Sequence, residues 1–297
     1  SESGNGQRTQ VLGIMKGTPT NICYTEYVDL VFSWGDLMTK WLVEEKVYSK
    51  DRIRTTGHPS TDHWLLPTNK EPNRKAGLTT TFRMLSNSLG GGTNAVKSIY
   101  QVEKSGGDGS YYLPPEHAEA WIYWEAAFLR LICNIVDYVV IPHNIRFELR
   151  PHHVETRMPY EFLVKQSKGL IQVIKEGTIS EWFQGIDVLL TYMSATALDA
   201  VVRGLPVISL KKILNQDALR RIPPGFHYDY YEYMWQAESL EQLKELIEET
   251  FRGRLPTSPN PDYFKEYVYR HFHFPRKRPS AYLVAKSIVD LIENNHP

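Results

Sequence analysis

Short apolar runs alternate with longer amphipathic segments along the chain. Runs rich in β-branched and aromatic residues predict strands at 11–15, 30–34, 52–56, 76–81, 147–150, 170–174, 188–191 and 206–209. Between them, apolar positions at helical spacing predict helices at 36–45, 116–136, 158–165, 180–185, 195–203, 240–251 and 281–293. Strands that alternate with helices are typical of βαβ units around a parallel sheet, so the sequence predicts the α/β class.

A polar stretch divides these predicted elements into two parts. Residues 67–75 contain two prolines and no apolar period, which is typical of an interdomain linker. We therefore expect an N-terminal, acceptor-side α/β lobe at 1–66 and a nucleotide-binding, Rossmann-like domain with C-terminal helices at 76–297. A Rossmann-like domain usually has about five or more strands, so we expect the first lobe to be partial or small. The Gly- and Ser-rich segment 105–110 predicts a flexible loop.

Charge and composition narrow the classes of partner. The 34 Lys and Arg residues balance 34 Asp and Glu residues, so no net field attracts nucleic acid, and we expect no nucleic-acid partner. The longest apolar runs are far shorter than the ~20 residues that span a bilayer. Two cysteines, Cys23 and Cys133, are too few for a disulfide scaffold, which fits a reducing compartment. These features predict a soluble, cytoplasmic protein.

The predicted strand 188–191 passes into the predicted helix 195–203 through a short polar turn. Such a turn directs free backbone N–H groups and the positive end of the helix dipole toward one point, which suits a phosphate. Ser194 is the expected N-cap, and Ala195 and Thr196 add backbone and hydroxyl donors. Asp199, one turn further on, could accept the hydroxyls of a ribose. In the structural alternative, Ser194 only caps its helix and Asp199 is solvated.

A second polar corner follows the predicted strand 147–150. Arg150, His152, His153 and Glu155 lie at or beyond its carboxyl end, and in open α/β sheets ligands bind at that edge. Arg150 could pair with a phosphate, and His152 could donate an N–H to a diphosphate or phosphodiester oxygen. A metal site here is the weaker alternative, because adjacent histidines on a turn rarely converge and no third ligand is suitably spaced.

These segments occur in an order that resembles a known family. Segments 150–155, 179–182, 187–200 and 204–209, preceded by 28–36 and 54–62, are similar to bacterial surface carbohydrate biosynthesis proteins. That family includes the β-Kdo transferases of capsule and lipopolysaccharide O-antigen assembly and, more distantly, resembles the CDP-glycerol glycerophosphotransferases of teichoic acid synthesis. The chain departs from the pattern in two places. It has His152-His153 where the family usually has His-Pro, and Asp199 where the family commonly has Glu.

The resemblance implies a GT-B glycosyltransferase that works without a metal or a cofactor. Its donor would be a CMP-, CDP- or UDP-linked sugar, for example Kdo from a CMP donor, and its acceptor a surface carbohydrate or glycolipid. Such a transferase needs a base or a nucleophile near the anomeric carbon, and His58, Asp62 and Glu155 are the candidates. Alternatively, 57–59 is a structural turn and Asp62 a helix N-cap. The competing functions are a nucleotide-sugar 2-epimerase and a degenerate, non-catalytic GT-B lobe.

Two further segments have more than one interpretation. The aromatic run 226–235 could stack on a sugar or a base, although such runs are more often packed connections between lobes. The basic residues 276–278, ahead of the last predicted helix, could give weak peripheral contact with a membrane, and a solvated helix start is the favoured alternative.

Overall fold

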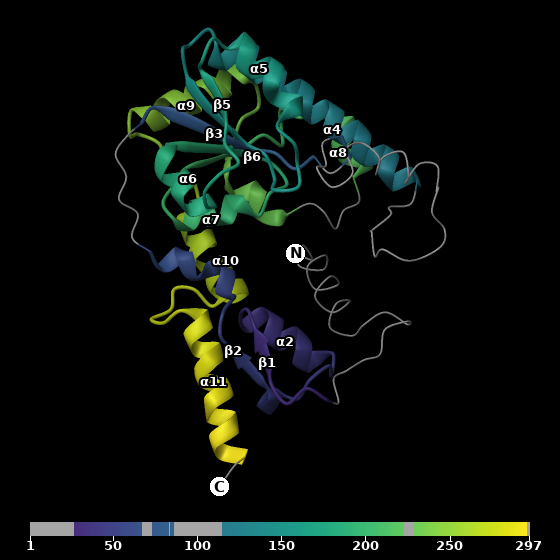
Figure 1. The fold of residues 1–297 in the computed structure, drawn as a ribbon, viewed down its shortest axis with the longest axis vertical. Helices are drawn as coiled ribbons and strands as arrows, with labels where there is room; N and C mark the ends of the chain where they lie inside the picture. The colour runs from purple at the N-terminus through teal and green to yellow at the C-terminus, as the bar shows by residue number, and fades with distance from the viewer. Residues whose placement is uncertain (1–26, 67–72, 83, 86–114, 223–227, 296–297) are drawn as a thin grey trace. The chain divides into compact units, whose positions relative to one another are not determined.

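The computed structural model describes residues 27–66, 73–82, 84–85, 115–222 and 228–295. They form two compact units, each described here by itself (Figure 1). Unit 1 combines residues 27–66 with residues 260–295, and unit 2 contains the described residues between 73 and 259. The predicted strand at 11–15 and the predicted loop at 105–110 lie outside the described residues.

Unit 2 is built on a six-stranded sheet in which every neighbouring pair is parallel. Its strands are β3 (Lys75–Thr79), β4 (Arg146–Arg150), β5 (Ile171–Val173), β6 (Val188–Thr191), β7 (Val207–Ser209) and β8 (Trp235–Gln236). The spatial order is β5-β4-β3-β6-β7-β8. Counted from β3, this is the 3-2-1-4-5-6 order of Rossmann domains, which confirms the predicted α/β class and Rossmann-type sheet.

Helices connect the strands of unit 2. They are α4 (Pro115–Ile135), which continues as a π-helical turn at Val136–Val140, α5 (Glu161–Gln166), α6 (Ile179–Gly185), α7 (Thr196–Val202), α8 (Gln216–Arg221) and α9 (Leu240–Phe251). Short 3-10 turns precede α5 at Met158–Tyr160 (η5) and precede β8 at Asp229–Tyr233 (η7). The long α4 packs against α8 (Figure 1). Neither α8 nor β8 is predicted from the apolar pattern, because each is too short to show a period.

The core of unit 2 follows from the composition of its central strands. All four residues of β6 are buried, as are Leu78 of β3 and Leu149 of β4. Strands buried on both faces are typical of parallel sheets with helices on both sides. The carboxylate of Asp187, just before β6, accepts the backbone N–H groups of Asn73 and Lys75, each at 3.0 Å. The end of the predicted 67–75 linker is thus fastened to the sheet, and Lys75 is already in β3.

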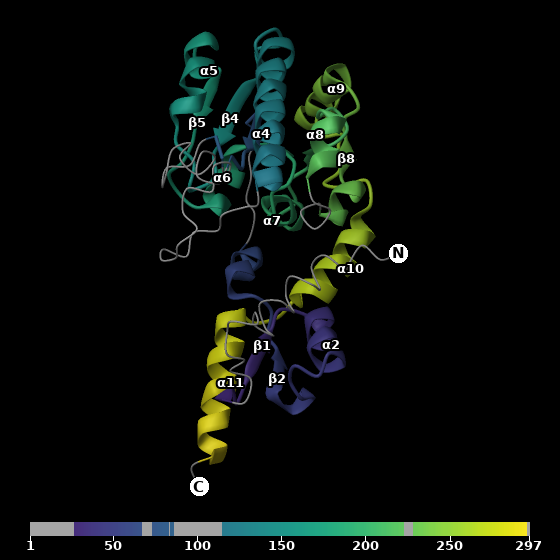
Figure 2. The same ribbon diagram turned by 90° about the vertical axis from the view of Figure 1, so that its right-hand side faces the viewer.

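Unit 1 contains a small parallel pair of strands with helices beside it. The strands are β1 (Val31–Ser33) and β2 (Ile53–Thr55), and the helical elements are α2 (Asp36–Glu44), η2 (Lys50–Arg52), η3 (Pro59–Leu65), α10 (Pro261–Phe272) and α11 (Ser280–Asn295). In Figures 1 and 2 the two strands lie between α2 and α11. Val31, Trp41, Leu42 and Ile53 contribute to its core.

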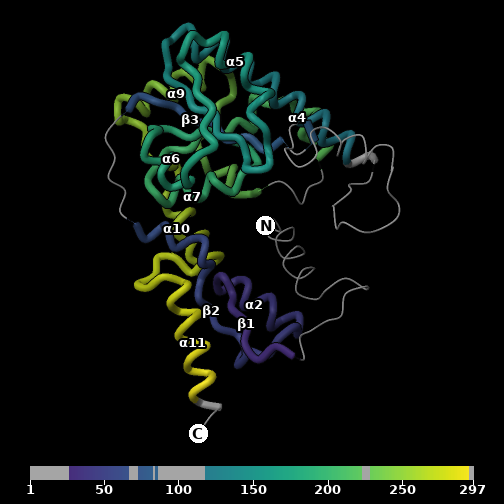
Figure 3. The backbone as a smooth tube through the Cα atoms, in the orientation of Figure 1, coloured from purple at the N-terminus to yellow at the C-terminus, as the bar shows by residue number. Residues whose placement is uncertain are grey.

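The C-terminal helices correct the predicted domain boundaries. The sequence places residues 260–297 with the nucleotide-binding domain, whereas α10 packs on α2 and α11 packs on η3, inside unit 1. Figure 3 shows this, because the purple and yellow ends of the described chain lie together in one unit. The ring of Trp64 meets those of Phe272 and Phe274 edge to face, each at 5.4 Å. Such contacts between distant segments leave no local periodicity in the sequence.

Gly35 permits the close approach of α10 to the start of α2. A methyl group there would lie 2.6 Å from the carbonyl oxygen of His271 and would also collide with the backbone of Arg270. Because backbone cannot rotate away, we expect Gly35→Ala to destabilise unit 1 by about 1–3 kcal/mol, the usual cost of overpacking. Hydrogen–deuterium exchange of unit 1 amides, with unit 2 amides as internal reference, measures the change.

A glycine in open surroundings supplies the control for this substitution. Gly185 ends α6, and no atom lies within 4 Å of the position that the methyl group of an alanine would take there. Gly185→Ala should therefore leave exchange unchanged or slightly slower in unit 2. Equal protection of unit 1 in the wild-type protein and in Gly35→Ala would contradict the packing interpretation.

Candidate functional site

The strand order of unit 2 brings the two predicted corners to one edge of the sheet. Both β4 and β6 pair with β3 in parallel, so the residues after Arg150 and after Thr191 lie at the same carboxyl edge, on either side of β3. The chain runs from β3 outward to β4 and β5, then returns to β6 on the other side of β3. The point between β3 and β6 is therefore the topological switch point, where open α/β sheets bind ligands. Thr79 and Thr191 face each other there, with their hydroxyl oxygens 2.6 Å apart.

The β6–α7 turn differs in detail from its prediction. The helix begins at Thr196, its N-cap is Ala195, and no side chain makes a capping hydrogen bond. Ser194 lies one residue before the cap, and its Oγ is 2.7 Å from Oγ1 of Thr196 and 3.4 Å from the Thr196 nitrogen. The prediction of Ser194 as N-cap is thus wrong by one residue. Asp199 lies in the first turn of α7 and is half-buried.

Tyr231 of η7 fixes the conformation of this turn. Its hydroxyl accepts the N–H of Ser194 at 2.8 Å and donates to the carbonyl oxygen of Ser194 at 2.7 Å. The ring is fully buried and meets the ring of Tyr192 edge to face at 5.1 Å. Burial raises the pKa of Tyr231, so the phenol stays protonated and can donate. Because Met193 adopts a left-handed conformation with φ of 59°, a side-chain anchor helps to hold the turn.

Tyr231 belongs to the aromatic run of the sequence, and no local signal gives it this role. The stacking of Tyr230 on Tyr231, with centroids 5.2 Å apart, places both rings within the core of unit 2. Residues 226 and 227 of that run lie outside the described residues. For these two tyrosines the packed interpretation is therefore favoured over contact with a ligand.

Glu155 organises the loop after β4. It is fully buried, and its carboxylate accepts the N–H of His152 at 2.9 Å, the hydroxyl of Thr80 at 2.9 Å and the hydroxyl of Tyr160 at 2.6 Å. Burial raises the pKa of Glu155 above its ordinary value, although the hydrogen bonds of Tyr160, Phe82, His152 and Thr80 oppose the shift. A carboxylate with no exposed surface cannot reach an acceptor sugar. This geometry favours a positioning role over the predicted catalytic one.

His152 and His153 lie at the carboxyl end of β4, and their ring centroids are 4.0 Å apart. His152 is half-buried and His153 is exposed. The two rings therefore lie side by side, and this contact alone does not direct their nitrogen atoms toward one ion. Within the described part of the chain, no group of three His, Cys, Asp or Glu residues could hold a metal ion.

Arg150 makes its described contacts with the loop between β5 and α6. Its guanidinium donates to the carbonyl oxygens of Glu176 at 2.8 Å and Gly177 at 2.6 Å, and it lies 5.7 Å from the centre of the Trp182 ring. These contacts use both terminal nitrogens, so Arg150 orders the neighbouring loop. A phosphate would have to compete with those carbonyl groups for the guanidinium.

The two remaining predicted catalytic residues belong to unit 1. His58 is the N-cap of η3, where its Nδ1 accepts the N–H of Ser60 at 3.1 Å. Burial and the charge of Arg276 lower the pKa of His58, with Asp62 acting in the opposite direction. A neutral imidazole that accepts at Nδ1 carries its proton on Nε2. In this state Nε2 is a donor rather than a base.

Asp62 connects η3 to the start of α11. Its Oδ1 is 2.5 Å from Nη2 of Arg276 and accepts the N–H of Ser280 at 2.6 Å, while Oδ2 accepts the N–H of Ala281 at 3.1 Å. Burial alone would raise the pKa of Asp62, but these hydrogen bonds lower it below the ordinary value. The partners favour a structural role, the alternative that the sequence left open. The side chain of Arg276, only 2% exposed, faces Asp62 rather than a membrane.

No helix in the described ranges is both long and apolar enough to cross a bilayer.

The comparisons with known proteins give distant similarities only. No protein-family model matches the chain, and no curated protein matches its sequence. Among solved structures, wall teichoic acid polymerase TagF is 13% identical with a TM-score of 0.46, covering 94% of this chain and 64% of that protein. TagF soaked with CDPG is 12% identical with a TM-score of 0.49, covering 94% of this chain and 63% of that protein. UDP-GlcNAc 2-epimerase from Methanocaldococcus jannaschii is 11% identical with a TM-score of 0.44, covering 90% of this chain and 64% of that protein.

This chain therefore spans somewhat less than two thirds of the length of those proteins. At these scores and identities, the likeness assigns neither a function nor a family.

Proposed function

We propose that unit 2 binds a nucleotide-activated sugar at its carboxyl edge, and that the protein is a metal-independent glycosyltransferase of the GT-B type. One observation carries the proposal. The Arg150–Glu155 corner and the Ser194–Thr196 turn flank β3 at the topological switch point of a Rossmann-type sheet. The sequence resemblance to surface carbohydrate biosynthesis proteins agrees with this position.

The residues at this edge divide into ligand-binding and supporting roles. We assign the phosphates of the donor to the hydroxyls of Ser194 and Thr196, the backbone N–H groups of Ala195 and Thr196, and an imidazole N–H of His152. We assign the ribose to Asp199. Glu155, Tyr231 and Arg150 hold these groups in place through the contacts described above.

Departure of the nucleotide is the step that this site could accelerate. When the bond between the sugar and the phosphate breaks, negative charge accumulates on the phosphate oxygens, and preorganised donors lower the barrier. The acceptor hydroxyl must lose a proton in the same reaction. His58 stays the candidate for that role predicted from the sequence, and its lowered pKa keeps the ring neutral near pH 7.

A panel of CMP-, CDP- and UDP-linked sugars tests this function directly. Binding is measured by calorimetry, and turnover by release of the free nucleotide with and without a carbohydrate acceptor. A transferase binds at least one donor and releases nucleotide faster when an acceptor is present. Sugar interconversion on UDP without an acceptor would identify an epimerase, and binding of none of the donors would identify a non-catalytic module.

The double substitution Ser194→Ala with Thr196→Val tests the phosphate contacts. Loss of two hydroxyls that bind phosphate should weaken nucleotide binding by about 1–3 kcal/mol. Isothermal calorimetry with the best donor of the panel measures the change. Thr250→Val is the matched control, because that hydroxyl donates to Leu246 within α9 and should leave affinity unchanged. Equal affinity of the double variant and the wild-type protein would show that the two hydroxyls act only within the turn and do not bind phosphate.

A further inference from the structure

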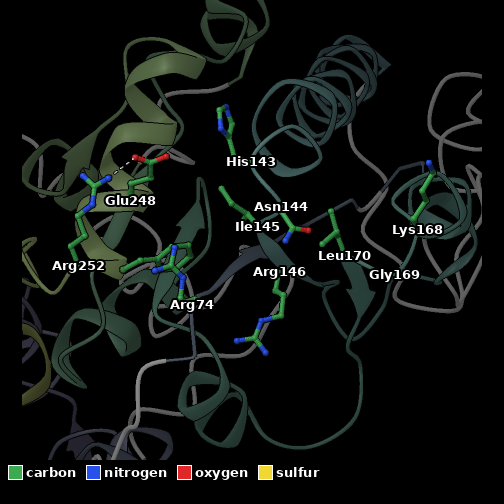
Figure 4. Close-up of a pocket in the computed structure, with 11 residues that line it drawn as sticks. Arg74, His143, Asn144, Ile145, Arg146, Lys168, Gly169, Leu170, Glu248 and Arg252 are labelled. Atoms are coloured by element: carbon green, nitrogen blue, oxygen red, sulfur yellow. Dashed lines mark hydrogen bonds and ion pairs between the residues drawn. The ribbon is translucent and has the colours of Figure 1, made fainter.

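A second cavity opens at the opposite, amino edge of the same sheet. Its volume is about 570 Å³, a usual size for a ligand site. Its wall includes Arg74 before β3, Arg146 at the first position of β4, Lys168 before β5 and Arg252 at the C-cap of α9 (Figure 4). Four separate segments thus each bring one cation to one cavity.

Little negative charge opposes these cations. Among the described residues that line the cavity, Glu248 is the single carboxylate, and it pairs with Arg252, which also contacts Glu249. Arg74 lies 5.6 Å from the centre of the Phe251 ring. Within the described residues, no carboxylate pairs with Arg74, Arg146 or Lys168. Since the whole chain has zero formal net charge, this cluster is a local concentration.

The backbone around the cavity is unusual as well. Arg74, Asn144 and Lys168 all line it, and all have left-handed conformations, with φ of 51°, 51° and 52°. Asparagine tolerates this region, whereas lysine and arginine adopt it at a conformational cost that glycine avoids. Lys168 follows the C-cap of α5, a position that glycine usually occupies. The conformational cost of a lysine or an arginine at such a position is explained if the charge of its side chain binds a ligand.

The cations are spread along the cavity. In Figure 4 Arg252 lies at one end and Lys168 at the other, with Arg74 and Arg146 between them. A longer anion with charges along its length matches cations spread in this way better than a single phosphate does. Arginine forks are suited to phosphate oxygens.

We propose that this amino-edge cavity binds an extended anion that carries several phosphate groups. The site is separate from the donor site of the proposed function, because Arg74, Arg146 and Lys168 lie at the starts of strands whose carboxyl ends carry that site. The exposure of the four cations leaves the cavity open to a ligand from solution.

Tripolyphosphate is a suitable probe, with orthophosphate as the short comparison. Calorimetry on the full chain at low salt should show tripolyphosphate binding more tightly than orthophosphate, and weakening toward 0.15 M salt, where the Debye length falls to about 8 Å. Arg146→Ala with Lys168→Ala should weaken tripolyphosphate binding about tenfold or more through loss of two charge-assisted contacts. Lys212→Ala with Arg220→Ala removes two cations of unit 2 that do not line the cavity, and should change little.

Competition separates this inference from the proposed function. Saturating CDP should leave tripolyphosphate bound, and the Arg146/Lys168 double variant should keep its affinity for nucleotide. Displacement by CDP, or affinity unchanged in the double variant, would overturn the amino-edge site. Binding of tripolyphosphate without binding of any nucleotide would contradict the proposed function and still support the amino-edge site.

Phosphatidylglycerol vesicles distinguish a membrane source of the phosphate groups from a free one. Co-sedimentation of the wild-type protein together with tripolyphosphate binding, both reduced in the double variant, would support the site and extend it to lipid headgroups. Tripolyphosphate binding without co-sedimentation would support a free anion. Co-sedimentation without tripolyphosphate binding would overturn the proposal in favour of a lipid surface.

Discussion

Replacement of Asp62 by Ala is expected to release the start of α11 and destabilise unit 1 by about 3 kcal/mol, the lower end of the range for a buried ion pair that loses one partner, because the carboxylate itself is 22% exposed. The reason is that Asp62 has three partners at once. It faces Nη2 of Arg276, whose side chain is only 2% exposed, and it accepts the N–H groups of Ser280 and Ala281 in the first turn of α11. Alanine leaves the guanidinium buried without its carboxylate.

Hydrogen–deuterium exchange in the first turn of α11 measures this effect, again with unit 2 as the internal reference. Asp62→Asn keeps one acceptor oxygen but loses the charge, so its exchange should fall between those of the wild-type protein and Asp62→Ala. Asp51→Ala is the matched control, because Asp51 belongs to the same unit and is exposed. If Asp62→Ala left α11 protected while abolishing transfer of sugar, Asp62 would be catalytic, as the sequence first suggested.

Protonation of Asp62 should also make the stability of unit 1 depend on pH. Because its partners lower the pKa of Asp62 in the folded protein, its contribution to stability is complete above the unfolded value of about 3.8 and is lost as pH falls through the lowered folded value. Unit 1 of the wild-type protein should therefore lose stability at the acid end, and Asp62→Asn should lose less over the same range.

Local patterns in the sequence predict most elements of the sheet but not the composition of the units. The predicted bounds of β4, β6 and β7 lie within one residue of the observed ones. Strands β6 and β7 are mostly apolar, as buried parallel strands usually are, whereas β4 alternates Phe147 and Leu149 with charged residues. Helix α10 is missed, since its aromatic residues alternate with charged ones. The association of α10 and α11 with the N-terminal strands depends on contacts such as Gly35 against His271, which join positions more than two hundred residues apart.

The candidate site shows the same division. Its location could be predicted, because strand-turn-helix segments and the order of strands place polar corners at one edge. The roles of Arg150 and Glu155 could not be predicted, since their partners come from other loops: Gly177 for the first and Thr80 and Tyr160 for the second. A charged residue in a motif can thus order neighbouring loops through contacts that the local sequence does not show.

Glu155 therefore gives the second large effect that we expect. Glu155→Leu fills a similar space but leaves the N–H of His152 and the hydroxyl of Thr80 without their acceptor, in a fully buried position, whereas the Tyr160 hydroxyl can still donate to Oγ1 of Thr80 at 2.8 Å. Each orphaned group costs about 1–3 kcal/mol, so unit 2 should lose roughly 2 kcal/mol or more. Urea unfolding, followed by amide exchange in β3 and β4, measures the loss.

Glu155→Gln separates support of the fold from support of the site. The Gln oxygen can still accept from His152, and the hydroxyls of Thr80 and Tyr160 can rotate to accept from the new amide, so the fold should persist with a smaller cost. Because burial raises the pKa of Glu155, the wild-type protein should lose stability as pH rises from the ordinary glutamate value toward the raised one, and the amide should not. If Glu155 positions His152, nucleotide affinity should fall in the order wild type, Gln, Leu, in step with the loss of order at the β4 corner. Full affinity in a folded Glu155→Leu protein would show that the donor site does not need this corner, because the anchor would be gone while the ligand still bound.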